Sequence, residues 1–134
     1  MKIVLDAMGG DFASIAPVNG AIEALKRVKS DTEIILIGDQ AEIKEALKGF
    51  TSPNLNIVHA SQSIEPDERA SKVVKTKPNS SMVLGLSMVK EKKANAFISA
   101  GNTGVQMATS TLLLGRIPHV KRPALSVFFP ALTG

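Results

Sequence analysis

Short runs of apolar residues alternate along the chain with segments in which apolar residues recur at helical spacing. The first run, Lys2 to Asp6 (KIVLD), is followed by a segment of this kind, formed by Ile15, Val18, Ile22, Leu25 and Val28. The second run, Glu33 to Ile37 (EIILI), is followed by Asp39 in the position of an N-cap and then by Ile43, Ala46, Leu47 and Phe50. Since β-branched runs favour strands and a spacing of three or four favours amphipathic helices, the pattern predicts two strand–helix units.

The same alternation continues through the second half of the chain. It predicts strands at Leu55 to Val58, Ala96 to Ser99 and Ala124 to Phe129, and helices at Ser81 to Lys92 and Asn102 to Leu114. The stretch from Ala60 to Asn79 contains two prolines and a cluster of charge, so we expect a long, mobile excursion there.

Strands that are apolar throughout and alternate with amphipathic helices are typical of a parallel sheet covered on both faces. The sequence therefore predicts an α/β fold with three αβα layers and a mainly parallel sheet. A chain of 134 residues, 44% of them hydrophobic, fits one globular unit. Ligands of such sheets bind outside the carboxyl ends of the strands.

Two glycine-rich links follow predicted strands at that edge. DAMGGD, from Asp6 to Asp11, follows the first strand, and SAGNTG, from Ser99 to Gly104, follows the fourth. Such a link brings backbone N–H groups together at the positive end of a helix, where an anion can bind without a lysine. The alternative is a pair of tight turns that need glycine for conformational reasons, with an aspartate capping a helix. Both interpretations stay open, but the shared edge favours one common site.

Nucleotide motifs are missing from both links. The sequence contains neither G-x-G-x-x-G nor a P-loop, and the carboxylates of Asp6 and Asp11 flank the first pair of glycines where a pyrophosphate would need donors. A magnesium site at these two acids stays open, but two acids without a phosphate loop do not define one. We therefore expect no cofactor and no metal, and the kinase and dehydrogenase classes lack support.

A basic cluster precedes the helix predicted from Ser81. The stretch KVVKTKPNSS places three lysines, Lys77 last, just before Ser80 and Ser81, which suit the start of a helix. Lysines there oppose the helix dipole, which hints at a recruited anion, whereas a solvated charged loop is the alternative. A second basic cluster, Arg116 to Pro123, contains His119.

Composition and charge exclude several classes of protein. Cysteine is absent, which excludes disulfides and a thiolate nucleophile. The net charge of +4 suits several anionic partners, but without Trp or Tyr the chain lacks aromatics for stacking on single-stranded bases, so nucleic acid is not expected. The apolar stretches fall short of the roughly 20 residues that cross a bilayer. The N-terminal apolar run is too brief for a secretory signal, so a cytoplasmic location is expected.

Taken together, these motifs resemble the PlsX family of phosphate acyltransferases. The resemblance includes DAMGGD, SAGNTG, the paired serines and RPAL (Arg122 to Leu125), in matching order and spacing over the whole chain. It implies transfer of a fatty acyl group from acyl-acyl carrier protein to inorganic phosphate, giving acyl phosphate for phospholipid synthesis. It also implies a fold similar to phosphotransacetylase and isocitrate dehydrogenase. Departures from the family pattern are the sparser basic run before Ser80 and Val105 in place of an alanine.

The family's chains are much longer, so we expect residues 1–134 to be a single α/β unit from the N-terminal part of a longer enzyme. The resemblance further implies a homodimer, and membrane association through the C-terminal part that is missing here. A non-catalytic module that binds carrier protein or a phosphorylated metabolite is the alternative function.

The resemblance and the helix-terminus argument together give a set of expected site residues. Asn102 and Thr103 are expected to act in catalysis, holding phosphate or the oxyanion with the backbone N–H groups between Gly101 and Gly104. The remaining residues expected to surround the substrates are Asp6, Gly9, Gly10, Asp11, Lys77, Ser80, Ser81, Ser99, Ala100 and Arg122. Asp6 and Asp11 are expected to orient loops or donors, because a carboxylate beside phosphate repels it.

Overall fold

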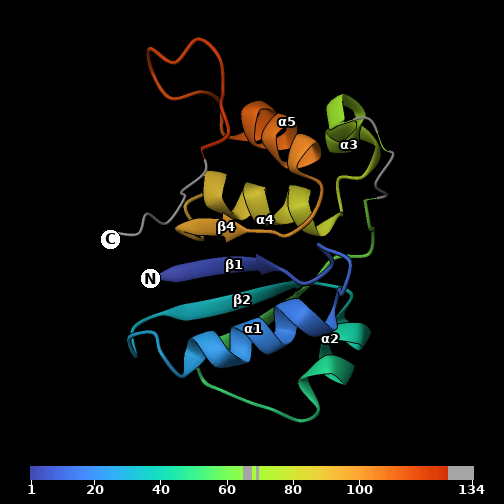
Figure 1. The fold of residues 1–134 in the computed structure, drawn as a ribbon, viewed down its shortest axis with the longest axis vertical. Helices are drawn as coiled ribbons and strands as arrows, with labels where there is room; N and C mark the ends of the chain where they lie inside the picture. The colour runs from blue at the N-terminus through green and yellow to red at the C-terminus, as the bar shows by residue number, and fades with distance from the viewer. Residues whose placement is uncertain (65–67, 69, 127–134) are drawn as a thin grey trace, which may run out of the picture.

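A four-stranded sheet forms the centre of the computed structural model, which describes residues 1–64, 68 and 70–126 (Figure 1). Its strands are β1 (Lys2–Asp6), β2 (Glu33–Gly38), β3 (Leu55–His59) and β4 (Ala96–Ile98). All neighbouring strands are parallel, and their order across the sheet is β3-β2-β1-β4. The predicted α/β class with a parallel sheet is confirmed.

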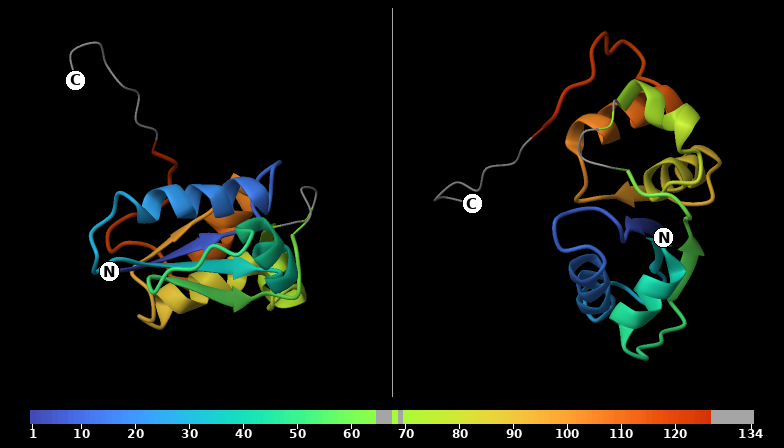
Figure 2. Two further views of the ribbon diagram at one scale, coloured as in Figure 1. Left: turned by 90° about the horizontal axis from the view of Figure 1, so that it is seen from below. Right: turned by 90° about the vertical axis from the view of Figure 1, so that its right-hand side faces the viewer.

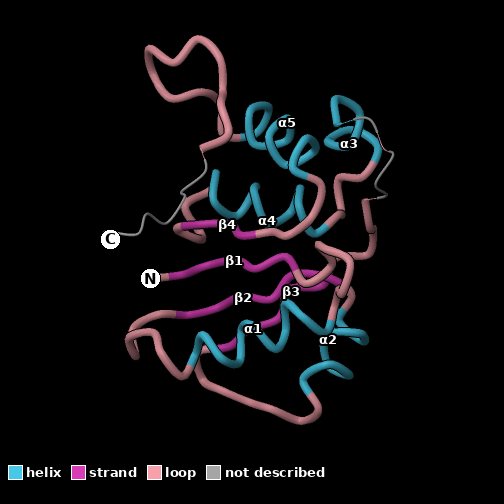
Figure 3. Tube along the Cα trace, viewed as in Figure 1, coloured by secondary structure: helices cyan, strands magenta, loops and turns pink. Residues whose placement is uncertain are grey.

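Helices flank the sheet on both faces (Figures 1 and 2). Helices α1 (Ile15–Leu25) and α2 (Gln40–Leu47) pack against one face, and α4 (Ser81–Lys90) packs against the other. Helices α3 (Ala70–Thr76) and α5 (Thr103–Leu113) pack against each other, and α5 also packs against α4 (Figure 3). The side of the sheet that carries α4 is therefore thicker than the side that carries α1.

Strand β2 is apolar at every position from Ile34 to Ile37, because both of its faces are covered. Ile34 and Leu36 join the core beneath α1 and α2, whereas Ile35 and Ile37 join the core beneath α4. Side chains of a strand point to opposite faces in turn, so a strand covered on both faces needs apolar residues at every position. A third cluster lies farther from the sheet and links α3, α4 and α5 through Val73, Met82, Val83, Leu86 and Val105.

The prediction of a long, mobile excursion from Ala60 to Asn79 is wrong for Ala70–Thr76, because these residues form the helix α3. Val73 fixes this short helix because its side chain is buried in the third cluster. The strand predicted from Ala124 to Phe129 is also wrong for residues 124–126, which have no regular structure. Residues 127–129 of that prediction lie outside the described residues.

The predicted N-cap at Asp39 is confirmed, and it makes stability depend on pH. The Asp39 carboxylate accepts hydrogen bonds from the backbone N–H groups of Glu42 (3.1 Å) and Ala41 (2.8 Å), which lower its pKa below the usual value. A carboxyl group whose pKa is lowered by folding stabilises the fold at pH values above its pKa in the unfolded chain, about 3.9. This stabilisation is lost as the pH falls through its pKa in the folded chain.

We therefore expect the free energy of unfolding, measured with urea, to change less between about pH 5 and about pH 2.5 for the Asp39→Asn variant than for the parent chain. This range brackets the ordinary aspartate pKa of about 3.9. Asparagine keeps the capping oxygen, so the variants differ mainly in titration. If the free energy of unfolding fell equally with decreasing pH in both proteins, the lowered pKa of Asp39 would be contradicted.

Candidate functional site

The two glycine-rich links lie side by side because β1 and β4 are neighbours in the sheet. From β1 the chain continues to β2 on one side, whereas β4 lies on the other side of β1. The links after β1 and β4 therefore leave the same edge in opposite directions. In open α/β sheets this arrangement opens a crevice at the carboxyl ends of the two strands, where ligands bind.

Asp6 ties the two links together. Its Oδ2 atom accepts a hydrogen bond of 2.7 Å from the Ser99 hydroxyl, 93 positions along the chain. Its Oδ1 atom accepts one of 2.9 Å from the backbone N–H of Met8. The Ser99 hydroxyl in turn accepts from the backbone N–H of Gly101 at 3.0 Å. Asp6 is only 3% exposed, so these bonds satisfy a carboxylate that water hardly reaches.

Close approach of the two links explains the first pair of glycines. A Cβ atom at Gly9 would lie 2.7 Å from the Ser99 Oγ atom and 2.8 Å from the Gly101 backbone nitrogen. Gly10 has a φ of +91°, and a Cβ atom there would lie 3.2 Å from the Cβ of Ala100. The turn and the contact between the links thus both require glycine here.

Helix α5 begins directly in the SAGNTG link. Asn102 is its N-cap, with the side-chain oxygen accepting a hydrogen bond of 3.0 Å from the backbone N–H of Val105. Within the described residues, the backbone N–H groups of Thr103 and Gly104 make no hydrogen bond, as expected of the first turn of a helix. These donors carry the positive end of the helix dipole and suit an anion.

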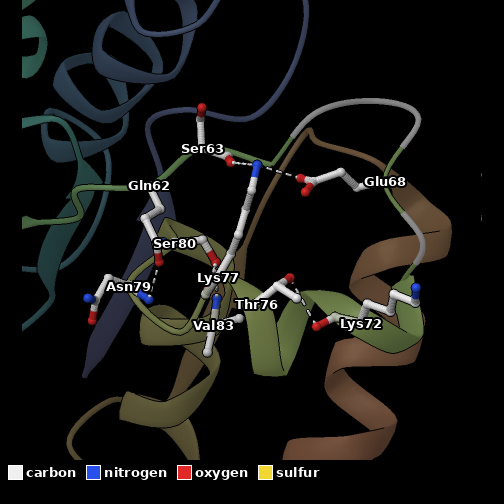
Figure 4. Close-up of polar contacts among 9 residues, drawn as sticks. All are labelled: Gln62, Ser63, Glu68, Lys72, Thr76, Lys77, Asn79, Ser80 and Val83. Carbon is white, nitrogen blue, oxygen red and sulfur yellow. Dashed lines mark hydrogen bonds and ion pairs between the residues drawn. The ribbon is translucent and has the colours of Figure 1, made fainter.

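Helix α4 also begins near this link. The Met82 methyl group, in the first turn of α4, would lie 3.7 Å from a Cβ atom at Gly101. Ser80 is the N-cap of α4 and is fully buried: its hydroxyl accepts from the Val83 N–H at 3.4 Å and donates to the Lys77 carbonyl at 2.9 Å (Figure 4). Ser81 is buried as well. Both serines therefore lie in the packed start of the helix.

The ammonium group of Lys77 turns toward the segment that precedes α3 (Figure 4). It donates a hydrogen bond of 2.6 Å to the Ser63 carbonyl and forms an ion pair of 2.7 Å with Glu68. Lys77 thus neutralises a carboxylate in this structure and supports the chain between β3 and α3.

Two cavities border the SAGNTG link. One, of about 360 Å³, lies beside β1 and β4 and is lined in part by Asp11, Ser99 and Ala100 together with the two glycines of the first link. The other, of about 560 Å³, lies beside α5, and its walls include Thr103 and Arg122. The expected site residues therefore fall into four groups. Some lie around the smaller cavity and some around the larger one, Lys77 and the two serines lie at the start of α4, and the start of α5 holds Gly101, Asn102 and Gly104, which line neither cavity.

Sequence reasoning missed two residues beside the smaller cavity. Phe12 follows the first link and is 76% exposed, and Ile98 precedes the second link and is 51% exposed. Large apolar side chains next to glycine-rich links were the available signal, because exposed aromatic and aliphatic groups at a crevice mark contact sites.

The described ranges contain no group of three or more His, Cys, Asp or Glu side chains placed to hold a metal ion. None of the helices in these ranges combines the length and the apolar character needed to cross a membrane.

Comparison with known proteins agrees with the motifs. The model of the family described as "Fatty acid synthesis protein" matches residues 1–134. A phosphate acyltransferase of Dictyoglomus turgidum is 46% identical over 99% of this chain, which corresponds to 40% of the relative. That of Caldanaerobacter subterraneus is 48% identical over the whole chain, again 40% of the relative, and that of Myxococcus xanthus is 44% identical over the whole chain and 38% of the relative.

The chain thus spans about 40% of the length of these curated relatives. This agrees with the prediction, made from the family resemblance, that the family's chains are much longer. The matching family model covers the whole chain, and each relative shares more than two fifths of its residues in the matched region. The chain therefore belongs to the fatty acid synthesis protein family, the PlsX family of phosphate acyltransferases.

Proposed function

We propose that this chain supplies the phosphate-binding part of an enzyme that transfers a fatty acyl group from acyl-acyl carrier protein to inorganic phosphate. The observation that carries the proposal is the meeting of DAMGGD and SAGNTG at the crevice between β1 and β4, beside the N-terminus of α5. The relatives are named phosphate acyltransferases, which supports the same reaction.

The chemistry needs little from the protein beyond positioning and charge stabilisation. Phosphate is already an oxygen nucleophile at neutral pH. One of its oxygens attacks the thioester carbonyl carbon, the C–S bond breaks, and the carrier thiolate leaves and takes up the proton of the attacking hydrogen phosphate. Backbone donors of Thr103 and Gly104, with the Asn102 amide and the Thr103 hydroxyl, hold the phosphate or stabilise the oxyanion. No covalent acyl-enzyme is needed.

The cationic residues act at the rim of this pocket. Arg122 approaches along the cavity that it shares with Thr103. An arriving phosphate competes with Glu68 for the ammonium of Lys77, which lies near the start of α4. Ser80 and Ser81 contribute through the helix terminus that they form. Asp6 acts as a positioning residue for both links.

The partners follow from the same reaction. Acyl carrier protein is acidic and suits a chain with a net charge of +4. We further propose a homodimer, peripheral membrane association through the C-terminal part of a longer enzyme, and a three-layer fold akin to phosphotransacetylase and isocitrate dehydrogenase, with residues 1–134 as its N-terminal unit.

Added salt is expected to slow acyl transfer. Raising ionic strength from 10 mM to 150 mM shortens the Debye length from about 30 Å to about 8 Å, which weakens long-range attraction between carrier protein and enzyme. Initial rates at subsaturating acyl-acyl carrier protein measure the effect, and a small thioester donor is the control. Equal salt dependence with both donors would contradict electrostatic steering.

Hydroxylamine trapping tests the proposed function. The longer enzyme that contains this chain is incubated with acyl-acyl carrier protein and phosphate, and hydroxamate formation is measured with and without phosphate. Phosphate-dependent hydroxamate supports acyl phosphate formation. Binding of carrier protein or phosphate without hydroxamate supports the alternative, a non-catalytic binding module.

Replacing Asn102 separates its capping role from its role toward phosphate. Asp caps helices as well as Asn does, so Asn102→Asp is expected to keep the thermal stability of the chain. It removes the amide donor and adds a negative charge, so hydroxamate formation is expected to fall about 10²–10³-fold or more. Asn102→Ser, which also caps but adds no charge, is the matched control. Full activity of the Asp variant would remove Asn102 from the mechanism.

A further inference from the structure

We propose that the smaller cavity, beside β1 and β4, receives the first methylene groups of the acyl chain, an inference that rests on the proposed acyl transfer. Its volume is about 360 Å³, and its apolar walls come from Leu5, Phe12, Ala16, Pro17 and Ile98. These residues belong to β1, β4, α1 and the link between β1 and α1. The apolar walls are therefore largely built from regular structure.

The cavity is open to a ligand because its largest side chains are uncovered. Phe12 is 76% exposed and Ile98 is 51% exposed. Among the described strands, β4 pairs with β1 alone, so none of them lies beside Ile98 on the other side. Burying such side chains against an alkyl chain removes apolar surface from water on both partners, which favours association.

Continuity with the candidate anion site favours an acyl chain over other apolar occupants. The cavity wall includes Gly9, Gly10, Ser99 and Ala100, which belong to the same two links. The SAGNTG link then runs on from Ala100 to the donors of Thr103 and Gly104 within four positions. A thioester carbonyl held at this link can present its carbon to bound phosphate while its alkyl chain extends toward Phe12.

Charge around the cavity favours an uncharged chain. Asp6 lines the cavity, and its carboxylate already accepts hydrogen bonds from Ser99 and Met8, so it needs no cationic ligand. Asp11 is exposed and also borders the cavity. A negative group at the far end of the ligand would meet this carboxylate, whereas a methyl-terminated chain would not.

The larger cavity beside α5 is the rival location. Its lining includes Met107, Ile117, Val120 and Leu125, but its outer wall is the segment after α5, which has no helix or strand between Gly115 and Ser126. Thr103 and Arg122 are the members of the expected site that border it. The smaller cavity, by contrast, is lined by both glycine-rich links.

Alkylphosphonates test the assignment because they join a phosphate-like head to an alkyl chain. We would titrate the 134-residue chain calorimetrically with inorganic phosphate and with methyl-, butyl-, hexyl- and octylphosphonate. Affinity is expected to rise by up to about fourfold per methylene group, the fold-change that corresponds to about 0.8 kcal/mol per buried methylene.

Phe12→Ala is expected to lower octylphosphonate affinity about tenfold and to leave methylphosphonate affinity unchanged. Ile98→Thr, which keeps a β-branched side chain in β4, is expected to act in the same direction.

Ile117→Ala is the matched control, because Ile117 is 74% exposed but lines the larger cavity. If Ile117→Ala flattens the series and Phe12→Ala does not, the alkyl chain lies beside α5 and the assignment is overturned. A flat series with measurable methylphosphonate binding overturns the assignment and leaves the anion site standing. Absence of binding for inorganic phosphate and every phosphonate overturns both.

Discussion

Alanine at position 9 is expected to lower phosphate-dependent hydroxamate formation by about 10²–10³-fold or more, the cost of losing preorganised donors in an acyl-transfer site. The added Cβ atom would lie 2.7 Å from the Ser99 Oγ atom, 2.8 Å from the Gly101 nitrogen and 3.0 Å from the Asp6 Oδ2 atom. One of these atoms is backbone and the others are joined by a hydrogen bond, so the contact is not relieved by turning a long side chain. The two links must move apart, which displaces the start of α5.

Gly20→Ala is the control for this substitution. Gly20 lies in α1, and apart from its chain neighbours and the backbone of its own helix no atom lies within 4 Å of its Cβ position. Alanine there therefore adds helix propensity without a clash. Activity measurements on both variants, with circular dichroism to monitor folding, separate a local effect at the site from loss of the fold. Parent-level activity of Gly9→Ala would show that catalysis does not require contact between the links.

Gly85→Ala is expected to destabilise the fold by about 1–3 kcal/mol, because overpacking a filled interior forces shifts of this cost. Gly85 is a buried residue of α4 facing the sheet, where an added Cβ atom would lie 2.5 Å from the Phe97 Cδ2 atom and 3.3 Å from a Val4 methyl group. Helix propensity alone would favour alanine by about 1 kcal/mol, so packing must overcome it. Urea unfolding measures the difference.

The matched comparison again uses Gly20, where alanine is expected to stabilise the chain by about 0.5–1 kcal/mol. The two substitutions are chemically identical and have opposite expected signs. Combining Gly85→Ala with Phe97→Leu is expected to cost less than the sum of the single changes, since the smaller side chain makes room for the added methyl group. Stabilisation by Gly85→Ala alone would contradict the close packing of α4 on β1 and β4.

Those parts of the fold whose sequence carries a strong local pattern were predictable. The bounds of β1 were predicted correctly because the run is apolar and ends at an aspartate. Helix α5 differs from its prediction by one residue at each end, because Asn102 and Leu114 are its capping residues. Helix α3 was missed, since it has seven residues and Val73 becomes a core residue only when α4 and α5 pack against it. Such burial depends on tertiary structure and leaves no periodic signal.

The candidate site was predictable to a smaller extent. Glycine-rich links at one edge of a parallel sheet follow from the order of strands and helices in the sequence. Their direct contact does not, because it depends on β4 pairing with β1 and not with β3. The hydrogen bond from Ser99 to Asp6 and the ion pair of Lys77 with Glu68 are likewise tertiary interactions. Their partners have no distinguishing feature in the sequence.

The hydrogen bond between Ser99 and Asp6 has a mechanical consequence for any ligand-induced motion. A ligand that displaces one glycine-rich link alone would break a hydrogen bond to a buried carboxylate, which costs about 1.5–3 kcal/mol. The two links are therefore expected to move as one rigid block, even though 93 positions separate Asp6 from Ser99 in the chain. Hinges that open or close the crevice are expected to lie outside this block.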